Sequence, residues 1–190
     1  MDRSWLTRRL KPLASGSNAT AESSGLVEAA VLVPVVERAA GPALLLTKRA
    51  PDLKDHAGQV CFPGGRIEPE DPDPAATALR EAREEVGLAP EQVALLGRLP
   101  CCRTGTGFRI HPVVGWVDRE PLLCPDPKEV EEIFFLPLHQ ALDPRRYRWE
   151  CLGEGAARRR FPVLPHPRHR IWGATARILF DLARILDGRG

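Results

Sequence analysis

Three glutamates, Glu81, Glu84 and Glu85, have the residue type and spacing best suited to chemistry in this chain. Positions i, i+3 and i+4 lie on one side of an α-helix, so the three carboxylates would repel one another. A hard divalent cation such as Mg²⁺ prefers carboxylate and phosphate oxygens and would remove that repulsion. The alternative is an ordinary surface helix in which Arg80 and Arg83 pair with the acids. The glutamates alone leave both interpretations open.

A glycine pair, Gly64-Gly65, lies upstream of these acids. Glycine permits close backbone approach and unusual dihedral angles, which suits a segment that lies against a phosphate chain. We predict that a loop begins at this pair and continues through the Pro- and Asp-rich segment 68–74. The glutamates begin sixteen residues after Gly65. Together, the glycine pair and the acids indicate a metal-assisted phosphate site.

The helix that carries the acids is predicted to run from Pro74 to Val86. Asp73 can cap its N-terminus, Pro74 suits its first position, and Gly87 suits the residue just beyond its end. Its apolar residues recur at intervals of four, three and four, and these are Ala75, Leu79, Ala82 and Val86. Such a stripe packs against a sheet and leaves the glutamates on another side of the helix.

The rest of the chain alternates strand and helix patterns. We predict strands over 26–36, 43–47, 59–63, 93–99, 110–117 and 132–135, and a second long helix over 170–186. These elements indicate an α/β layered fold. A chain of 190 residues fits one domain. We divide it into residues 1–25, a short surface helix and a flexible linker, and residues 26–190, the single domain.

The segment from Gly65 to Leu88 resembles the signature box of the Nudix hydrolases, Gly-x5-Glu-x7-Arg-Glu-U-x-Glu-Glu-x-Gly-U, where U is a bulky aliphatic residue. Residues 80–88 match the tail of the box except for Ala82 at its first aliphatic position. Asp71 replaces the first acid of the box, and eight residues rather than seven separate it from Arg80. The resemblance implies a Nudix-type α/β/α sandwich, in which a mixed β-sheet lies between helices.

Three upstream segments, 45–49, 53–60 and 62–65, resemble the region that marks the coenzyme A pyrophosphatases within this family. Downstream, the resemblance continues at Gly107, 112–115, 129–130, 137–138 and 171–175. It implies that the substrate is coenzyme A, or a thioester or oxidised form of it. Cleavage at the pyrophosphate would give 4′-phosphopantetheine and adenosine 3′,5′-bisphosphate, with water as the nucleophile and Mg²⁺ or Mn²⁺ as cofactor.

This resemblance suggests a role for each candidate residue. The metal ligands are Glu81, Glu84 and Glu85, of which Glu84 and Glu85 are also catalytic, and Glu129 is the candidate general base. Residues expected to contact the substrate are Lys48, Arg49, Lys54, His56, Gly64, Gly65 and Arg66. Glu129 could equally lie on a solvated strand edge, and His56 could be hydrogen-bonded within a loop. Arg80 is either an orienting partner for the acids or an ordinary surface arginine, and Cys61 is interpreted as a small packed residue.

Composition limits the partners. A net charge of +2 gives no large attractive field for nucleic acid or anionic lipid. We interpret the arginines that cluster late in the chain as solvated surface, and these are Arg145, Arg146, Arg148, Arg158, Arg159, Arg160, Arg168 and Arg170. Five cysteines without a Cys-x-x-Cys pair favour reduced thiols in the cytoplasm. No apolar run is long enough to span a membrane. We therefore expect a small-molecule substrate, no nucleic acid and no membrane, and a monomer or homodimer.

Three alternatives remain at this level. The protein could be a Nudix hydrolase for another nucleoside diphosphate derivative, such as ADP-ribose, a nucleotide sugar or a dinucleotide. It could be a catalytically silent Nudix module that senses a nucleotide. It could also bind nucleic acid through the late arginines, in which case its affinity would depend strongly on salt.

Overall fold

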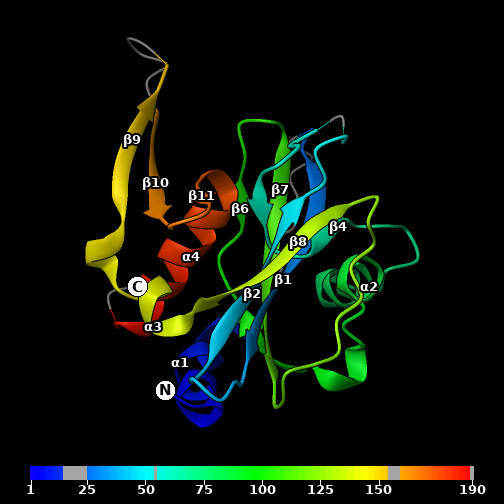
Figure 1. Cartoon of the computed structure of the whole chain (residues 1–190), viewed down its shortest axis with the longest axis vertical. Coiled ribbons are helices and arrows are strands. Elements are labelled where there is room, and N and C mark those ends of the chain that lie inside the picture. Colours follow the sequence, from blue (N-terminus) through cyan, green and yellow to red (C-terminus); the bar gives the residue numbers. More distant parts are fainter. Residues whose placement is uncertain (15–24, 54, 154–158, 189–190) are drawn as a thin grey trace.

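The computed structural model describes residues 1–14, 25–53, 55–153 and 159–188 (Figure 1). A mixed sheet of eight strands forms the centre of this described part. In chain order the strands are β1 (Val27–Val36), β2 (Ala43–Arg49), β3 (Val60–Cys61), β4 (Gly64–Arg66), β5 (Ala94–Arg98), β6 (Cys102–Arg103), β7 (Phe108–Val117) and β8 (Val130–Pro137). β1 and β7 run parallel along their whole length. The other pairings are antiparallel.

Helices cover both faces of this sheet. They are α1 (Arg3–Ala14), α2 (Pro74–Val86), α3 (Leu138–Ala141) and α4 (Gly173–Leu186), with short 3₁₀ turns η1 (Pro90–Gln92) and η2 (Pro144–Arg146). Figure 1 shows α2 on one side of the sheet and α4 on the other. The predicted α/β/α sandwich with a mixed sheet is therefore confirmed.

Side chains along β1 point alternately to the two faces of the sheet, so this one strand contributes to the core on both sides. Ala30, Leu32 and Val36 pack with α2, whereas Val33 and Val35 pack with α1 and α4. Successive side chains of a strand point to opposite faces, and a strand buried on both sides is therefore apolar nearly throughout. This arrangement places α2, with its glutamates, on a rigid support.

Helix α1 is part of the core rather than a surface helix alone. Leu6 and Leu10 are fully buried and pack with residues of β5 and α4. Arg9 Nε also donates to the carbonyl of Leu186 at the end of α4 (3.1 Å). The predicted linker lies mostly at residues 15–24, outside the described residues. No helix in the described ranges is long and apolar enough to cross a membrane.

The prediction of a loop at Gly64-Gly65 is wrong, because these residues form β4 and pair antiparallel with β1. Neither glycine has a positive φ. A Cβ at Gly64 would overlap the carbonyl oxygen of Ala30 on β1, and a Cβ at Gly65 would overlap the carboxylate of Glu81. Glycine is required here for close approach and not for unusual dihedral angles.

A second, three-stranded sheet was not predicted. It consists of β9 (Arg148–Leu152), β10 (Arg159–Pro165) and β11 (Arg170–Ile171) in the order β11-β10-β9. The predicted helix over 170–186 starts only at Gly173, because Arg170 and Ile171 pair with Pro165 and Leu164 of β10. The late arginines that are described lie exposed, as interpreted from the sequence, whereas Arg158 is outside the described residues.

Candidate active site

Helix α2 begins and ends where its sequence predicts. The Asp73 carboxylate accepts hydrogen bonds from the backbone N–H groups of Ala75 (2.8 Å) and Ala76 (2.9 Å). Pro74 occupies the first turn, and Gly87 adopts the left-handed conformation at φ 72°. Capping at both ends fixes the helix register, and so it fixes which residues face the sheet.

The three glutamates of α2 lie in different environments. The side chain of Glu85 is 3% exposed and that of Glu81 is 15% exposed, whereas that of Glu84 is 59% exposed. Gly64 N–H of β4 donates to Glu85 Oε2 (3.3 Å), and Gly65 leaves room for the carboxylate of Glu81. The structure therefore turns Glu81 and Glu85 toward β4 and leaves Glu84 in solvent.

Arg80 connects the acids to the preceding segment. Its Nε and Nη2 atoms donate to the two carboxylate oxygens of Asp71 (3.2 and 3.0 Å). Its Nη1 donates to Glu81 (2.8 Å) and Glu84 (3.1 Å), and its Nη2 also donates to the carbonyl of Arg66 (3.2 Å). These bonds support the interpretation of Arg80 as an orienting partner over that of an ordinary surface arginine.

Asp71 fulfils a structural role despite the longer spacer before Arg80. Besides its bidentate pair with Arg80, it accepts from Thr77 Oγ1 (2.9 Å) and from the backbone N–H of Glu68 (3.0 Å). The hydrogen bonds from Arg80 lower the pKa of Asp71 to about 2, with smaller contributions from Glu68 and Thr77. The carboxylate is therefore ionised at neutral pH, and it ties the segment after β4 to α2.

Negative charge in the site is only partly balanced. Burial raises the pKa of Glu85 to about 8; Arg49 opposes this rise, while the charges of Glu81 and Glu129 add to it. Burial also raises the pKa of Glu81, against the hydrogen bond from Arg80. The guanidinium of Arg49 lies 3.9 Å from Glu85, too far for a strong bond. The partly buried Glu81 thus has a close positive partner in Arg80, whereas the buried Glu85 has only the longer contact with Arg49 among the described residues.

A divalent cation fits the chemistry of these donors, because carboxylate oxygens held close together in a partly dry site are hard ligands. The side chains do not converge on a common point, however. In the described ranges, no group of three or more His, Cys, Asp or Glu side chains is arranged to hold a metal ion. Arg80 Nη1 lies between Glu81 and Glu84 and bonds to both.

Glu129 lies close enough to act on the buried pair. It occupies the turn before β8, where it is exposed, and its carbonyl accepts from the N–H of Ala50 (2.8 Å). Its charge raises the pKa of both Glu81 and Glu85. The sequence contains no spacing that predicts this approach, because it depends on the pairing of β8 with β2.

The other predicted substrate residues are dispersed around β2, β3 and β4. Lys48 pairs with Glu131 (2.7 Å), and Arg66 lies exposed with its guanidinium 5.7 Å from the centre of the Phe108 ring. His56 has a positive φ of 59° and shares a hydrogen bond with Gln59 (3.2 Å) in an exposed turn. Lys54 lies outside the described residues.

Cys61 is not a nucleophile in this structure. Burial raises the pKa of its thiol to about 11, and the hydroxyl of Thr47 lies 3.1 Å from its sulfur. A thiol in this state stays protonated at neutral pH. The interpretation of Cys61 as a packed residue is confirmed.

Comparison with known proteins agrees with this arrangement. The NUDIX domain family matches residues 27–151, and the chain therefore belongs to the Nudix family. Members of the family are pyrophosphohydrolases of nucleoside diphosphate derivatives and generally use divalent metal ions such as Mg²⁺ or Mn²⁺.

Two bacterial relatives match most of the chain. A protein of Pectobacterium atrosepticum described as "Uncharacterized Nudix hydrolase NudL" is 41% identical over 162 residues, covering 85% of this chain and 84% of that protein. A protein of the same description from Cronobacter sakazakii is 43% identical over 156 residues, covering 82% and 81%. Among solved structures, a C. elegans Ap4A hydrolase complex has a TM-score of 0.52 at 19% identity, covering 60% of this chain and 83% of that one. The last similarity concerns the fold alone.

Proposed function

We propose that this Nudix protein hydrolyses the pyrophosphate bond of coenzyme A or one of its derivatives, giving 4′-phosphopantetheine and adenosine 3′,5′-bisphosphate. The observation that carries the hydrolytic part is the partly buried Glu81 beside the buried Glu85 against β4, where Arg49 lies 3.9 Å from the Glu85 carboxylate. The choice of coenzyme A rests on the resemblance of segments 45–49, 53–60 and 62–65.

Glu81, Glu84 and Glu85 would hold Mg²⁺ or Mn²⁺. When bound, the metal supplies neutralisation of the phosphate oxygens and a lower pKa for the attacking water. Glu84 is in solvent and bonded to Arg80, so it must leave that partner to join Glu81 and Glu85. Arg80 keeps its bidentate bond to Asp71 during this change, and Asp71 thereby holds the guanidinium in place.

In the reaction, water attacks one phosphorus atom, and the bond from that phosphorus to the bridging oxygen breaks. Glu129 is the proposed acceptor of the water proton, because its charge raises the pKa of Glu81 and Glu85 and it is itself exposed. Arg49, beside Glu85, and Lys48 and Arg66, at the ends of β2 and β4, would bind phosphate oxygens. His56 and Lys54 would contact the rest of the substrate. Gly64 and Gly65 allow the backbone of β4 to approach it.

Two other functions remain in competition. A different nucleoside diphosphate derivative, such as ADP-ribose, a nucleotide sugar or a dinucleotide, would use the same carboxylates, and the C. elegans structure with the same fold is of an Ap4A hydrolase. A silent nucleotide sensor has no need for a buried acid, Glu85, whose pKa is raised by burial and by the charge of Glu81. We also propose that this protein is cytoplasmic, is a monomer or homodimer, and binds neither nucleic acid nor a membrane.

The deciding experiment incubates the purified chain and Mg²⁺ or Mn²⁺ with coenzyme A, ADP-ribose, a nucleotide sugar and a dinucleotide, and resolves the products by chromatography. Adenosine 3′,5′-bisphosphate should appear fastest from coenzyme A. Glu85→Gln and Glu81→Gln should each lower kcat on the order of 10³-fold, the size expected when one group that stabilises transition-state charge is removed. Glu91→Gln removes an exposed acid from η1, away from the pair, and is the matched control.

Faster cleavage of ADP-ribose or a dinucleotide than of coenzyme A would reject coenzyme A as the substrate. The proposal that the protein is a hydrolase would still stand. A chain that binds these nucleotides but cleaves none of them with either metal would reject hydrolysis itself.

A further inference from the structure

A cysteine, a histidine and a glutamate form a second chemical cluster, separate from the glutamates of α2. Glu28 belongs to β1 and His111 to β7, the parallel neighbour of β1, while Cys101 immediately precedes β6. His111 Nε2 lies 2.6 Å from Glu28 Oε2, and His111 Nδ1 lies 3.3 Å from Cys101 Sγ. The imidazole thus connects a carboxylate on one side to a thiol on the other.

The short bond to Glu28 determines what the imidazole can do. A carboxylate only accepts hydrogen bonds, so the proton between the two groups belongs to His111 Nε2. The lone pair of the neutral ring then lies on Nδ1, which faces Cys101 Sγ. A nucleophile, a base beside it and an acid that orients the base are the three parts of an activated nucleophile.

The surroundings of the thiol include charges of both signs. Arg109 of β7 pairs with Glu28 (3.2 Å), and Arg103 of β6 is also near the thiol. Burial raises the pKa of Cys101, Arg109 and Arg103 oppose that rise, and Glu28 adds to it. The thiol therefore depends on His111 Nδ1, 3.3 Å from its sulfur, to accept its proton as it reacts.

The other cysteines lack this arrangement. Cys61 is next to a threonine hydroxyl, and burial raises its pKa to about 11. Cys102 is buried, while Cys124 and Cys151 are exposed. Cys101 is exposed and also has a histidine partner, so a reagent in solution can reach it. Cys124 and Cys151 serve as internal references for an exposed thiol.

We propose that Cys101 is a nucleophilic thiol that exchanges with small-molecule disulfides, with His111 as its base and Glu28 as the positioning residue. In the exchange, the Cys101 proton passes to His111 Nδ1 and the sulfur attacks one sulfur of the disulfide. A new S–S bond forms to Cys101 as the old one breaks, and the departing thiolate takes the proton from His111. Cys101 is oxidised to a mixed disulfide, and the small molecule is reduced to one thiol. This proposal does not rest on the hydrolase reaction.

The test treats the folded chain with oxidised glutathione and quantifies mixed disulfide at each cysteine by peptide mass mapping. At pH 7, Cys101 should react about tenfold faster than Cys124 and Cys151, because His111 accepts the thiol proton as the sulfur attacks. His111→Gln should reduce Cys101 to the rate of Cys124. His139→Gln changes an exposed histidine of α3 and should leave the rate unaltered.

The pH profile separates positioning from simple packing. In the wild type, the Cys101 rate should remain high below pH 8, whereas in His111→Gln it should fall with pH as an ordinary thiol does. Glu28→Gln should shift the profile toward that of His111→Gln while the circular dichroism spectrum stays native. In the wild type, equal rates of mixed-disulfide formation at Cys101, Cys124 and Cys151 would by themselves overturn the proposal. An unchanged Cys101 rate in folded His111→Gln would overturn the role of the base.

Discussion

The buried Glu85 on the α2 side of the sheet differs from two buried hydroxyls of the C-terminal layer, which comprises α3, η2, β9, β10, β11 and α4. On the α2 side, Glu85 is buried with a long contact to Arg49 and one backbone N–H. In the C-terminal layer, the Tyr147 hydroxyl donates to Ala141 (2.6 Å) and Thr175 Oγ1 donates to Val60 (2.8 Å). The Tyr147 and Thr175 hydroxyls each have a neutral backbone partner, whereas the buried carboxylate of Glu85 keeps a free-energy cost that packing alone does not explain.

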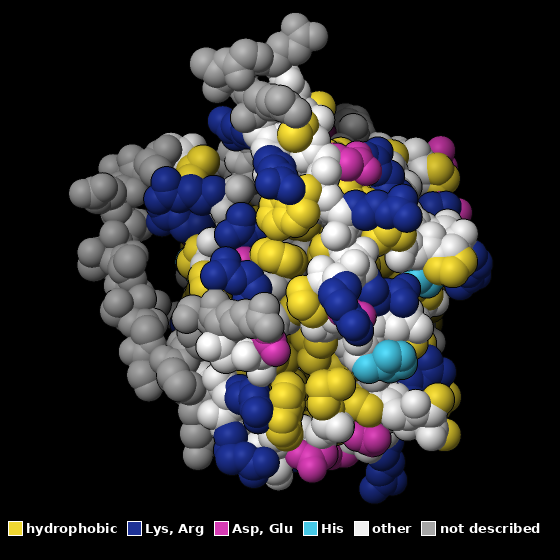
Figure 2. Space-filling view, turned by 90° about the vertical axis from the view of Figure 1, so that its left-hand side faces the viewer, with side chains coloured by type: hydrophobic (Ala, Val, Ile, Leu, Met, Phe, Trp, Pro, Cys, Tyr) yellow, Lys and Arg dark blue, Asp and Glu magenta, His cyan; other side chains and the backbone are white. Residues whose placement is uncertain are grey.

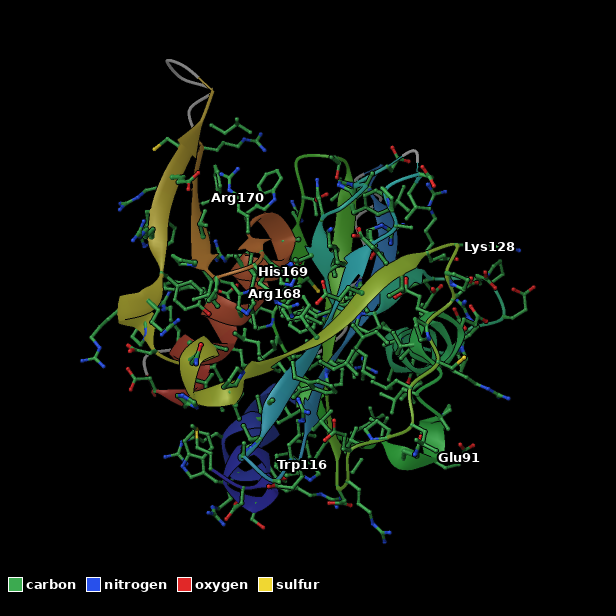
Figure 3. The ribbon with its side chains drawn as sticks, viewed as in Figure 1. Glu91, Trp116, Lys128, Arg168, His169 and Arg170 are labelled. Atoms are coloured by element: carbon green, nitrogen blue, oxygen red, sulfur yellow. The ribbon has the colours of Figure 1, made fainter. Side chains whose placement is uncertain are left out.

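Basic and hydrophobic side chains are mixed on the surface of the C-terminal layer (Figure 2). Figure 2 views the molecule from the side of β9, and Lys and Arg side chains are spread among hydrophobic ones on that face. Figure 3 labels Arg168, His169 and Arg170, which follow one another in the segment between β10 and α4. Arg168 pairs with Glu132 (2.9 Å), Arg170 pairs with Glu150, and His169 stacks on Phe134 with ring centres 4.2 Å apart. Surface pairs of this kind contribute little to stability.

The largest effect expected from this contrast is on stability without metal. The pKa of Glu85 is 4.5 unfolded and about 8 folded. Because the folded state holds the proton more tightly, the stabilising contribution is complete below pH 4.5 and is lost as pH rises through about 8. In EDTA, wild-type protein should lose on the order of 3 kcal/mol between pH 5 and pH 8 relative to Glu85→Gln, measured by urea unfolding.

Glu84→Gln is the control for that comparison, because it removes the same charge from an exposed position of the same helix. Its pH dependence should follow the wild type. Parallel curves for the wild type and Glu85→Gln would mean that Glu85 is as well accommodated as the polar groups of the C-terminal layer. The contrast between the two regions would then disappear.

A smaller effect is expected at Arg80. Lysine keeps the charge but cannot bond both oxygens of Asp71 while also reaching Glu81 and Glu84. Arg80→Lys should lower kcat about 10- to 100-fold, the loss typical when a group that orients metal ligands is replaced, and should change KM little. Arg83→Lys, exposed on the same helix, is the matched control. An increase in KM with unchanged kcat would indicate that Arg80 binds substrate instead of orienting the acids.

Sequence reasoning worked where the signal was local. Asp73, Pro74 and Gly87 fix the two ends of α2 through bonds within a few residues, and the observed helix has the predicted bounds. The spacing of the box places Glu81, Glu84, Glu85 and Arg80 on one helix, but it does not predict that Glu84 lies in solvent while Glu81 and Glu85 lie toward β4.

Features that depend on distant pairing were not predicted. Gly64 and Gly65 were predicted to form a loop, because two glycines weaken a strand. They form β4 instead, because β1 approaches Gly64 and the carboxylate of Glu81 approaches Gly65 too closely for a Cβ atom. The β9–β10 hairpin has exposed residues throughout β9, so it lacks the apolar alternation that marks a strand. The link from Glu28 through His111 to Cys101 spans 83 and 10 residues. It depends on the parallel pairing of β1 with β7 and on the antiparallel pairing of β6 with β7.

The smallest effect expected lies in the C-terminal layer. Tyr147→Phe removes a buried hydroxyl and leaves the carbonyl of Ala141 without its donor, while the edge-on contact with Phe180 is kept. The cost should be about 1 kcal/mol of unfolding free energy, measured by urea denaturation, with kcat unchanged. Arg80→Lys should show the reverse pattern, in which activity is lost and stability changes little. A fall in kcat for folded Tyr147→Phe would show that the C-terminal layer contributes to catalysis, and the division between a supporting region and a reacting one would fail.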